Sequence, residues 1–274
     1  MDHPHHSYPV KHVDRTRADA YLARIGAERP AAPTAGALRA LHLAHLRAVP
    51  FENLSVHLGE DITLDSDALV AKLVDRRRGG FCYELNGAFA ALLGALGFDV
   101  TLLQARVVGE GGRLGIPYDH LALRVRDGEG GDWLADVGFG THTHLPLAYE
   151  ERGEQSEPGG VFRIEEAADG DLLVLRDGEP QYLLDQRPRA LADFTAGAWY
   201  HRTSPASHFS RSLVCSLLTE DGRITLSGHT LTTTVGAERT RTELPTDAAV
   251  LDAYDQHFGI TLDRLPAEPD IAEG

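Results

Sequence analysis

The chain has 274 residues, of which 42% are hydrophobic, and its 41 acidic and 26 basic side chains give a formal net charge of −15. This composition is typical of a globular protein with a packed core, while the acidic surplus and the scattered arginines argue against nucleic-acid and anionic-membrane binding. No run approaches the about 18 apolar residues that span a bilayer, and residues 1–15 lack the apolar stretch of a secretory signal, so we expect a cytoplasmic protein.

The first part of the chain, residues 1–98, is predicted to be helical. Each of the first three helices has a residue suited to capping its N-terminus: Asp14 or Thr16, then Thr34, then Asp65 or Ser66. The first helix is expected to end at Gly26. Apolar side chains recur at helical spacing in the second and third helices, at Leu38, Leu41, Leu46, Leu69, Val70, Leu73 and Val74. These faces are expected to pack together as a small bundle.

The fourth helix is predicted to begin near Cys82 and to end at Gly97. A helix N-terminus together with an imidazolium brings a thiol pKa from about 8.5 to between about 3.5 and 7.5, which would make Cys82 a nucleophile. The preceding Gly79 and Gly80 permit a sharp turn and leave room above the sulfur. The alternative is a small buried hydrophobic residue, and position alone does not decide between the two. Cys82 and Cys215 are far apart and form no disulfide framework.

After Gly97 the pattern changes to short β-rich runs separated by glycine-rich turns. The predicted strands cover residues 100–108, 120–127, 132–139, 162–167, 171–177 and 181–185. From about residue 211 a mixed segment follows, with strands at 213–219, 223–228 and 229–235 and a helix at 246–257, which is followed by Gly259. Helices followed by a run of strands predict an α+β fold.

A histidine and an aspartate accompany the strands at 120–127 and 132–139. His120 begins the first of these strands and Asp136 lies near the end of the second. If they face each other directly across a hairpin, the reversal must centre on Gly128, which the turn sequence permits. An imidazole that takes the thiol proton and a carboxylate that orients the imidazole are what a cysteine nucleophile needs. Taken singly, each has an ordinary structural explanation; the combination predicts a triad of Cys82, His120 and Asp136.

Other chemistries find less support in the sequence. The histidine groups His3, His5 and His6, His42 and His45, and His142 and His144 have no cysteine or carboxylate cluster to complete a metal site. Neither a dinucleotide fingerprint nor a P-loop is present. We therefore expect no metal, and an anionic cofactor would have to be held by local arginines, hydroxyl groups and backbone amides.

Segments spread over nearly the whole chain resemble those of arylamine N-acetyltransferases: YLARIG at 21–26, VPFENL at 49–54, RRGGFCYELN at 77–86, GFDVTLLQARV at 97–107, DHLALRV at 119–125, DVGFG at 136–140 and SPASHF at 204–209. RGGFC, a histidine 38 residues after the cysteine and the DVGFG aspartate 16 residues beyond form a highly specific combination. The resemblance implies a helical bundle at 1–98, a β-barrel at 99–210 and an α/β lid at 211–274, with a cysteine-protease-like core.

The resemblance also implies a reaction. Cys82 would accept the acyl group, His120 would act as its base and Asp136 would orient the imidazole. Acetyl-CoA would be the donor and an arylamine or hydrazine the acceptor, with ping-pong kinetics. Phe139 and Gly140, and more loosely Phe209, are implied beside the cleft that receives the pantetheine and the aromatic ring, although core packing explains them equally well.

Two positions depart from the expected family pattern. Asp119 stands before His120 where a small hydroxyl residue is expected, so that a further charge lies beside the imidazole or the CoA entrance. THTHLPL follows Gly140 without a second glycine, which bears on the acyl-donor pocket. Glu52 and Asn53 are expected to brace the bundle, and Arg78 to pair with a buried carboxylate.

Three alternatives remain at this point. An amide synthase of similar scaffold would release a polyketide acyl chain from a carrier protein onto an aromatic amine. A hydrolase would use the same triad with water as the acceptor. If the cleft only binds a ligand and the protein is not an enzyme, Cys82→Ala would change nothing measurable.

Overall fold

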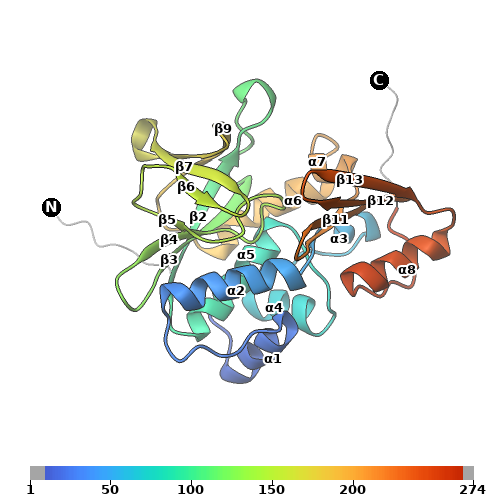
Figure 1. Ribbon diagram of the computed structural model, residues 1–274, viewed down its shortest axis with the longest axis horizontal. Coiled ribbons are helices and arrows are strands. Elements are labelled where there is room, and N and C mark those ends of the chain that lie inside the picture. The colour runs from blue at the N-terminus through green and yellow to red at the C-terminus, as the bar shows by residue number, and fades with distance from the viewer. Residues whose placement is uncertain (1–9, 268–274) are drawn as a thin grey trace.

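The structure, a computed structural model, describes residues 10–267 and begins with helices (Figure 1). These are α1 (Arg15–Ile25), α2 (Ala35–Ala48), α3 (Leu54–Leu58), α4 (Ser66–Val74) and α5 (Cys82–Ala95). The side chains of Asp14, Thr34 and Asp65 accept hydrogen bonds from first-turn amides of α1, α2 and α4, and Gly26 ends α1 at φ 67°. The four predicted helices are confirmed as α1, α2, α4 and α5, whereas the one-turn helix α3 is not foreseen.

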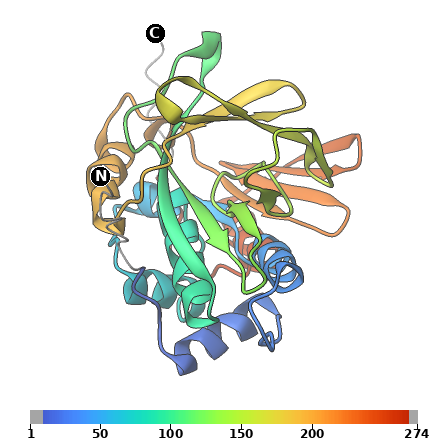
Figure 2. The same ribbon diagram turned by 90° about the vertical axis from the view of Figure 1, so that its left-hand side faces the viewer.

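An antiparallel sheet of eight strands follows and curves into a near-closed barrel (Figure 2). Its strands are β2 (Asp99–Val107), β3 (His120–Arg126), β4 (Asp132–Ala135), β5 (Leu147–Ala148), β6 (Gln155–Glu157), β7 (Gly160–Glu166), β8 (Leu172–Arg176) and β9 (Glu179–Leu184). Their spatial order is β5-β4-β3-β2-β9-β8-β7-β6. The six predicted strands correspond to β2, β3, β4, β7, β8 and β9, but β4 ends at Ala135, so that Asp136 begins a loop.

The strands β2 and β3 are largely buried on both faces. One face packs against the helices, and the other faces the inside of the barrel. Leu121 and Leu123 pack with α5 in the first hydrophobic core, while Leu103 and Ala122 belong to the core inside the barrel. Burial on both faces explains the apolar run of Leu121, Ala122 and Leu123 in β3. The pair β2–β3 therefore carries the barrel directly against the helix that begins with Cys82.

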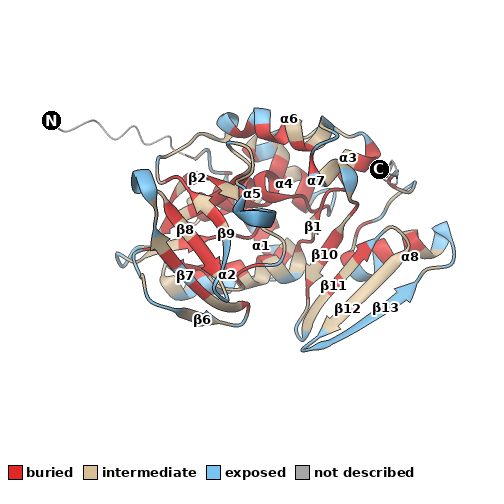
Figure 3. Cartoon of the chain, turned by 90° about the horizontal axis from the view of Figure 1, so that it is seen from above, coloured by how far each residue is buried: buried red, intermediate tan, exposed pale blue. Residues whose placement is uncertain are grey.

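The chain closes with a second sheet and α8. The remaining elements are α6 (Thr195–Thr203), α7 (His208–Arg211), β10 (Cys215–Leu218), β11 (Gly222–Ser227), β12 (Thr230–Val235), β13 (Glu238–Glu243) and α8 (Asp247–Phe258), with short 3₁₀ turns at Glu110–Gly112, Ala168–Gly170 and Leu191–Phe194. β1 (Phe51–Glu52), from the helical part, pairs with β10 at the edge of this sheet. β13, the other edge strand, is exposed along its whole length (Figure 3). The sequence does not predict α6, α7, β1 or β13.

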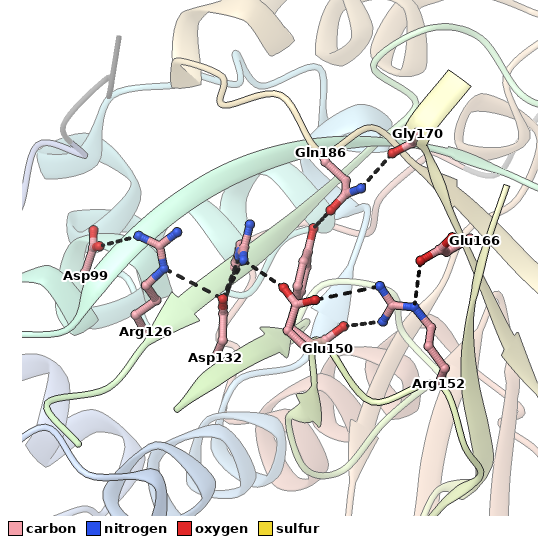
Figure 4. A network of polar contacts seen from close by, with 10 residues as sticks. Asp99, Arg126, Asp132, Glu150, Arg152, Glu166, Gly170 and Gln186 are labelled. Atoms are coloured by element: carbon pink, nitrogen blue, oxygen red, sulfur yellow. Dashed lines mark hydrogen bonds and ion pairs between the residues drawn. The ribbon is translucent and has the colours of Figure 1, made fainter. Parts of the chain in front are cut away.

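At the end of β3 remote from His120, charged side chains form a surface network (Figure 4). Arg126 contacts Asp99 and Asp132, and Arg124 joins Asp132 to Glu150.

Within residues 10–267 no helix is long and apolar enough to cross a membrane. The division into 1–98, 99–210 and 211–274 stays a proposal.

Candidate active site

The first residue of α5, Cys82, is a free thiol and nearly buried, with 4% of its surface exposed. Its Sγ lies 3.9 Å from the backbone carbonyl of Asp119, which immediately precedes β3. The side chain of Glu84 accepts a hydrogen bond from the Phe81 amide at 3.3 Å and so satisfies a donor at the start of the helix. The sequence-predicted position of Cys82 at a helix N-terminus is therefore confirmed.

The glycines before Cys82 act by close approach rather than by a sharp turn. A Cβ on Gly79 would lie 1.9 Å from the carbonyl oxygen of Pro50, and one on Gly80 would lie 2.6 Å from the Glu84 carboxylate. Neither has a positive φ, which is found instead at Arg77, at 52°. The expected sharp turn at these two glycines is wrong, because the structure has no turn there. The expected room above the sulfur stays a prediction.

His120 and Asp136 meet, but not as direct cross-strand partners. Leu123 pairs with Ala135 and Arg126 with Asp132, so the hairpin centres on residue 129 and not on Gly128. Continued by one residue, this register puts Asp136 opposite Ala122, two residues from His120 along β3. Side chains two residues apart in a strand point to the same face, so Asp136 and His120 share one face. A carboxylate and an imidazole are long enough to meet across this diagonal. His120 Nε2 lies 2.6 Å from Asp136 Oδ2.

Three further groups hold the Asp136 loop. Asn86 Nδ2 donates to Asp136 Oδ1 at 2.8 Å, and Asn86 Oδ1 accepts from the Val137 amide at 2.9 Å. The Gly138 amide donates to Asp136 Oδ1 at 3.0 Å, and the Asp136 amide donates to His42 Nε2 at 3.2 Å. The sequence motifs do not single out Asn86, although it stands four residues after Cys82 and hence on the same face of the helix.

The electrostatics of the site follow from burial and from Asp136. Burial alone would lower the pKa of His120, but the Asp136 carboxylate outweighs it and raises that pKa to about 10. Burial would raise the pKa of Asp136, but His120 and Asn86 bring it down to about 2. The imidazole is thus kept strongly basic next to an ionised carboxylate.

The pKa of the Cys82 thiol is raised, because burial outweighs the lowering by His120. The sequence-based expectation of a lowered thiol pKa is therefore wrong: the helix N-terminus and the imidazole only partly replace the lost hydration of a thiolate. Cys82 and His120 form one coupled pair, in which a thiolate is stable only beside the imidazolium. Proton transfer inside this pair is what the geometry permits.

The loop after Asp136 packs directly on the backbone of α5, which leads to a prediction for Gly138. A Cβ there would lie 2.7 Å from the Cys82 Cα and 2.7 Å from Asn86 Nδ2. We expect Gly138→Ala to destabilise the protein by about 1–3 kcal/mol, as overpacking does, and to slow alkylation of Cys82. Thermal melts and iodoacetamide kinetics measure both effects. Gly36→Ala, in α2 with no atom closer than 3.9 Å, serves as control and should be neutral or stabilising; equal behaviour of the two variants would contradict the prediction.

The three residues expected at a substrate cleft lie around this site. The Phe139 ring is perpendicular to the His120 ring, with centroids 5.1 Å apart. Gly140 has a φ of 89°, and a Cβ there would lie 3.6 Å from the Phe51 ring. The ring of Phe209, on α7, lies 5.0 Å from that of Phe81. Their role in binding stays a prediction. Cys82 lines neither of two cavities of the molecule. The lining of the first includes Val10 and Leu191, and that of the second includes Leu58 and Arg264.

Buried charges brace the helical part beside the site. Arg78 Nε lies 3.0 Å from Glu52 Oε1, and the Lys72 ammonium lies 2.5 Å from Glu84 Oε1. Asn53 donates to the backbone carbonyl of Phe209 at 2.9 Å and thereby fixes α7. The expected pairing of Arg78 with a buried carboxylate and the bracing role of Glu52 are confirmed. Asn53 instead joins the helical part to α7 and the segment before β10.

The histidines considered as metal ligands have other surroundings. His42 donates from Nδ1 to the His144 carbonyl oxygen at 2.9 Å, while burial lowers the pKa of His42 to about 4, so that it stays neutral. His142 fills the barrel, with its ring 4.7 Å from that of Phe139. Among the described residues, 10–267, no three potential ligands are arranged to hold a metal ion. His3, His5 and His6 lie outside the described residues.

Comparisons with known proteins agree with the geometry. A family model described as N-acetyltransferase matches residues 34–266. The chain is 36% identical over 253 residues to an arylamine N-acetyltransferase of Mycolicibacterium smegmatis, covering 89% of this chain and 92% of the relative. It is also 36% identical over 247 residues to an arylamine N-acetyltransferase / N-hydroxyarylamine O-acetyltransferase of Salmonella typhimurium, covering 88% of each.

Solved structures of arylamine N-acetyltransferases have a similar overall fold. An arylamine N-acetyltransferase from Salmonella typhimurium superposes with a TM-score of 0.84 at 31% identity, covering 96% of this chain and 95% of that one. The Mycobacterium marinum arylamine N-acetyltransferase in complex with CoA superposes with a TM-score of 0.81 at 34% identity, covering 89% and 92%.

Proposed function

Because the chain belongs to the arylamine N-acetyltransferase family, we propose that it carries an acetyl group from acetyl-CoA through a thioester on Cys82 to the nitrogen of an arylamine or hydrazine. The observation that carries this proposal is the meeting of His120 with Asp136, at 2.6 Å, beside the thiol that begins α5. A cytoplasmic location, expected from the sequence, stays a prediction.

In the first half-reaction His120 takes the proton from the Cys82 thiol. The thiolate attacks the carbonyl carbon of the thioester, and His120 returns the proton to the departing CoA sulfur. Asp136 keeps the imidazole oriented and stabilises its protonated form. The acetyl group is then bound to Sγ and the leaving thiol is free.

In the second half-reaction the acceptor nitrogen attacks the acetyl carbon. Arylamines suit this step because their low basicity leaves the nitrogen lone pair unprotonated at neutral pH. His120 accepts the proton that the nitrogen loses, and the Cys82 sulfur departs, which restores the starting pair. The alternation of the two substrates on one sulfur predicts ping-pong kinetics. Incubating the protein with acetyl-CoA alone and measuring its intact mass tests the proposal.

Two arginines near Gly140 support a phosphate-bearing donor such as CoA. Arg176 donates from Nη1 to the carbonyl oxygen of Thr141, directly after Gly140, at 3.1 Å. Arg223 donates to Ser216 Oγ at 3.0 Å. Ser216 is the strand partner of Phe51, against which Gly140 packs.

The electrostatics show that the two guanidinium groups share one region. Burial and the positive charge of Arg176 lower the pKa of Arg223 to about 10, with no carboxylate contribution. Burial together with Arg223, Arg176 and Arg47 lowers the pKa of His144. Glu157 and Asp177 are the carboxylates that face Arg176. Within residues 10–267 Arg223 thus remains a desolvated cation without a carboxylate partner, as expected of a group that meets an anion.

We expect Arg223→Gln to raise the KM for acetyl-CoA about tenfold, because a charged hydrogen bond contributes on the order of 1.5–3 kcal/mol. The KM for the acetyl thioester of N-acetylcysteamine, which lacks phosphate, should not change. Steady-state kinetics with both donors measure the difference. Arg241→Gln, on the exposed strand β13, removes the same charge as a control. A parallel rise for both donors would count against phosphate recognition by Arg223.

A further inference from the structure

The hydroxyl group of Tyr83 binds the segment that leads into the strand of His120. Tyr83 follows Cys82 directly in α5 and is fully buried. Its hydroxyl donates to the backbone carbonyl of Tyr118 at 2.6 Å and to that of Asp119 at 3.1 Å, so that one proton is shared between two acceptors. The residue after the thiol is thus tied to the two residues that precede His120.

The first of these two residues, Tyr118, has a strained backbone. Its φ of 60° lies in the left-handed region, where a bulky residue persists only if neighbouring groups hold it. Its amide donates to Gln104 Oε1 at 3.0 Å, and the Tyr83 hydroxyl holds its carbonyl. The Arg189 guanidinium lies 5.4 Å from the centre of the Tyr118 ring, and the Phe194 ring is perpendicular to that ring at 5.5 Å between centroids. The backbone just before β3 is therefore held by contacts and not by its own preference.

The second residue, Asp119, turns its backbone carbonyl toward the sulfur. Cys82 Sγ lies 3.9 Å from this oxygen, within reach of a weak hydrogen bond from the thiol. In the proposed mechanism the thiol proton must instead pass to His120. Donation by the Tyr83 phenol withdraws electron density from the same oxygen, which makes it a weaker acceptor for the thiol and lessens its repulsion of a thiolate. The phenol therefore favours proton transfer to the imidazole.

Helix α6 leaves this bond little room to shift. A Cβ on Gly197 would lie 2.7 Å from the carbonyl oxygen of Tyr118 and 2.7 Å from the hydroxyl of Tyr83. The Tyr83 ring also packs against the rings of Phe81 and Phe194, with centroids 5.3 Å and 5.7 Å away. The bond is thus enclosed by packed groups, and a side chain at position 197 would displace it.

We propose that Tyr83 is a positioning residue for acetyl transfer, whose hydroxyl holds the strained backbone before β3 and directs the thiol to His120 rather than to the Asp119 carbonyl. The proposal rests on the proposed function in taking Cys82 as the nucleophile. It gives the residue after the nucleophile a role that no member of the triad fulfils.

The titratable and charged groups around the sulfur and this hydroxyl come from α5, the start of β3, the loop after β4, the segment after β9, and α6. They are Cys82, Asp119, His120, Asp136, Arg189 and His201. Burial raises the pKa of Tyr83 well above its ordinary value, so the phenol is a neutral donor at neutral pH. Tyr83→Phe therefore removes a hydrogen-bond donor without removing a charge.

The test combines single-turnover acetylation by acetyl-CoA with the pH dependence of Cys82 alkylation by iodoacetamide, both in the full chain. Tyr83→Phe should slow acetyl-enzyme formation about fivefold and raise the alkylation midpoint by about 0.7 pH unit, as loss of one neutral hydrogen bond predicts. The acetyl-CoA concentration that gives half the maximal rate should stay within about twofold, because the buried hydroxyl donates to backbone and not to the donor.

Tyr254→Phe is the matched control. Tyr254 is fully buried in α8, and its hydroxyl has no hydrogen-bond partner among residues 10–267. Removing this hydroxyl should leave both readouts unchanged. A general effect of losing a buried phenol would appear in both variants, whereas the proposed effect is confined to Tyr83→Phe.

Gly197→Ala supplies a second variant, which displaces the same bond from α6. It should shift the alkylation midpoint in the same direction as Tyr83→Phe, and the double variant should shift it no further than the larger of the two, because both changes act on one bond. Thermal melts show whether each variant folds. Either single variant carries a signed expectation if the other fails to fold.

A raised alkylation midpoint with unchanged half-saturation in Tyr83→Phe supports the proposal. A midpoint that falls, or that stays within the range of Tyr254→Phe, overturns it, as does a double variant whose shift is the full sum of the single shifts. Absence of an acetyl adduct in the wild type would refute the proposed function instead, while the alkylation midpoints would still decide the role of Tyr83.

Discussion

Cys82→Ala is expected to gain no acetyl mass from acetyl-CoA and to transfer acetyl groups at least about 10³-fold more slowly than the wild type. The sulfur is the atom that bonds the acetyl group in the proposed mechanism, and the methyl group of alanine cannot replace it. Intact-mass measurement after incubation with acetyl-CoA, followed by addition of an aromatic amine, shows whether an adduct forms and whether the amine removes it.

Cys215→Ala is the matched control for this experiment. Cys215 is fully buried in β10, and its thiol pKa is raised well above the ordinary value, mainly by burial. It should therefore contribute no adduct, and its variant should acetylate like the wild type. An adduct that persists in Cys82→Ala, or a wild type that gains no mass, would refute the assignment. Acetate release at an equal rate with and without amine would identify a hydrolase.

The second large effect is expected from Asp136→Asn, which should lower kcat/KM by about 10³–10⁴-fold, as loss of the carboxylate does in other triads. Asp136 Oδ2 contacts His120 while Oδ1 accepts from Asn86 and Gly138. An amide at this position removes the charge that keeps the imidazole basic, and its NH₂ group cannot accept a bond from His120 Nε2.

Steady-state kinetics and iodoacetamide alkylation near neutral pH measure this loss. Alkylation should slow along with turnover, because the same imidazole activates the sulfur in both reactions. Asp132→Asn, four residues earlier in the chain, controls for removal of a carboxylate from the same hairpin. Turnover within about threefold of the wild type in Asp136→Asn would exceed anything expected of a triad that has lost its carboxylate.

The local signals of the sequence predicted much of the helical part. Asp14, Thr34 and Asp65 cap their helices because a short side-chain oxygen reaches the free amides of the first turn, and this depends only on neighbouring residues. Cys82 begins α5 for similarly local reasons. By contrast β13 consists of exposed polar and charged residues, so it shows no apolar alternation by which a strand is recognised.

The geometry of the active site depends on contacts between residues that are far apart in the chain. The sequence singled out His120 and Asp136, but their contact depends on a register centred one residue from the expected Gly128. Both registers put the pair on one face, because a shift of the centre by one residue moves the partners by two. Asn86 and Gly138 were missed because their roles lie in bonds and close approaches between α5 and the barrel.

The sequence by itself determined which residue types are present for acyl transfer, where the principal helices begin, and which family the motifs resemble. Only the tertiary structure decided the depth at which the sulfur lies, which raises its pKa instead of lowering it, and the bond from the Tyr83 hydroxyl to the Tyr118 carbonyl across 35 positions of the chain. Capping and periodicity act between neighbours, whereas desolvation and hydrogen bonds between distant residues depend on distances that exist only once the helices, the barrel and α6 have packed together.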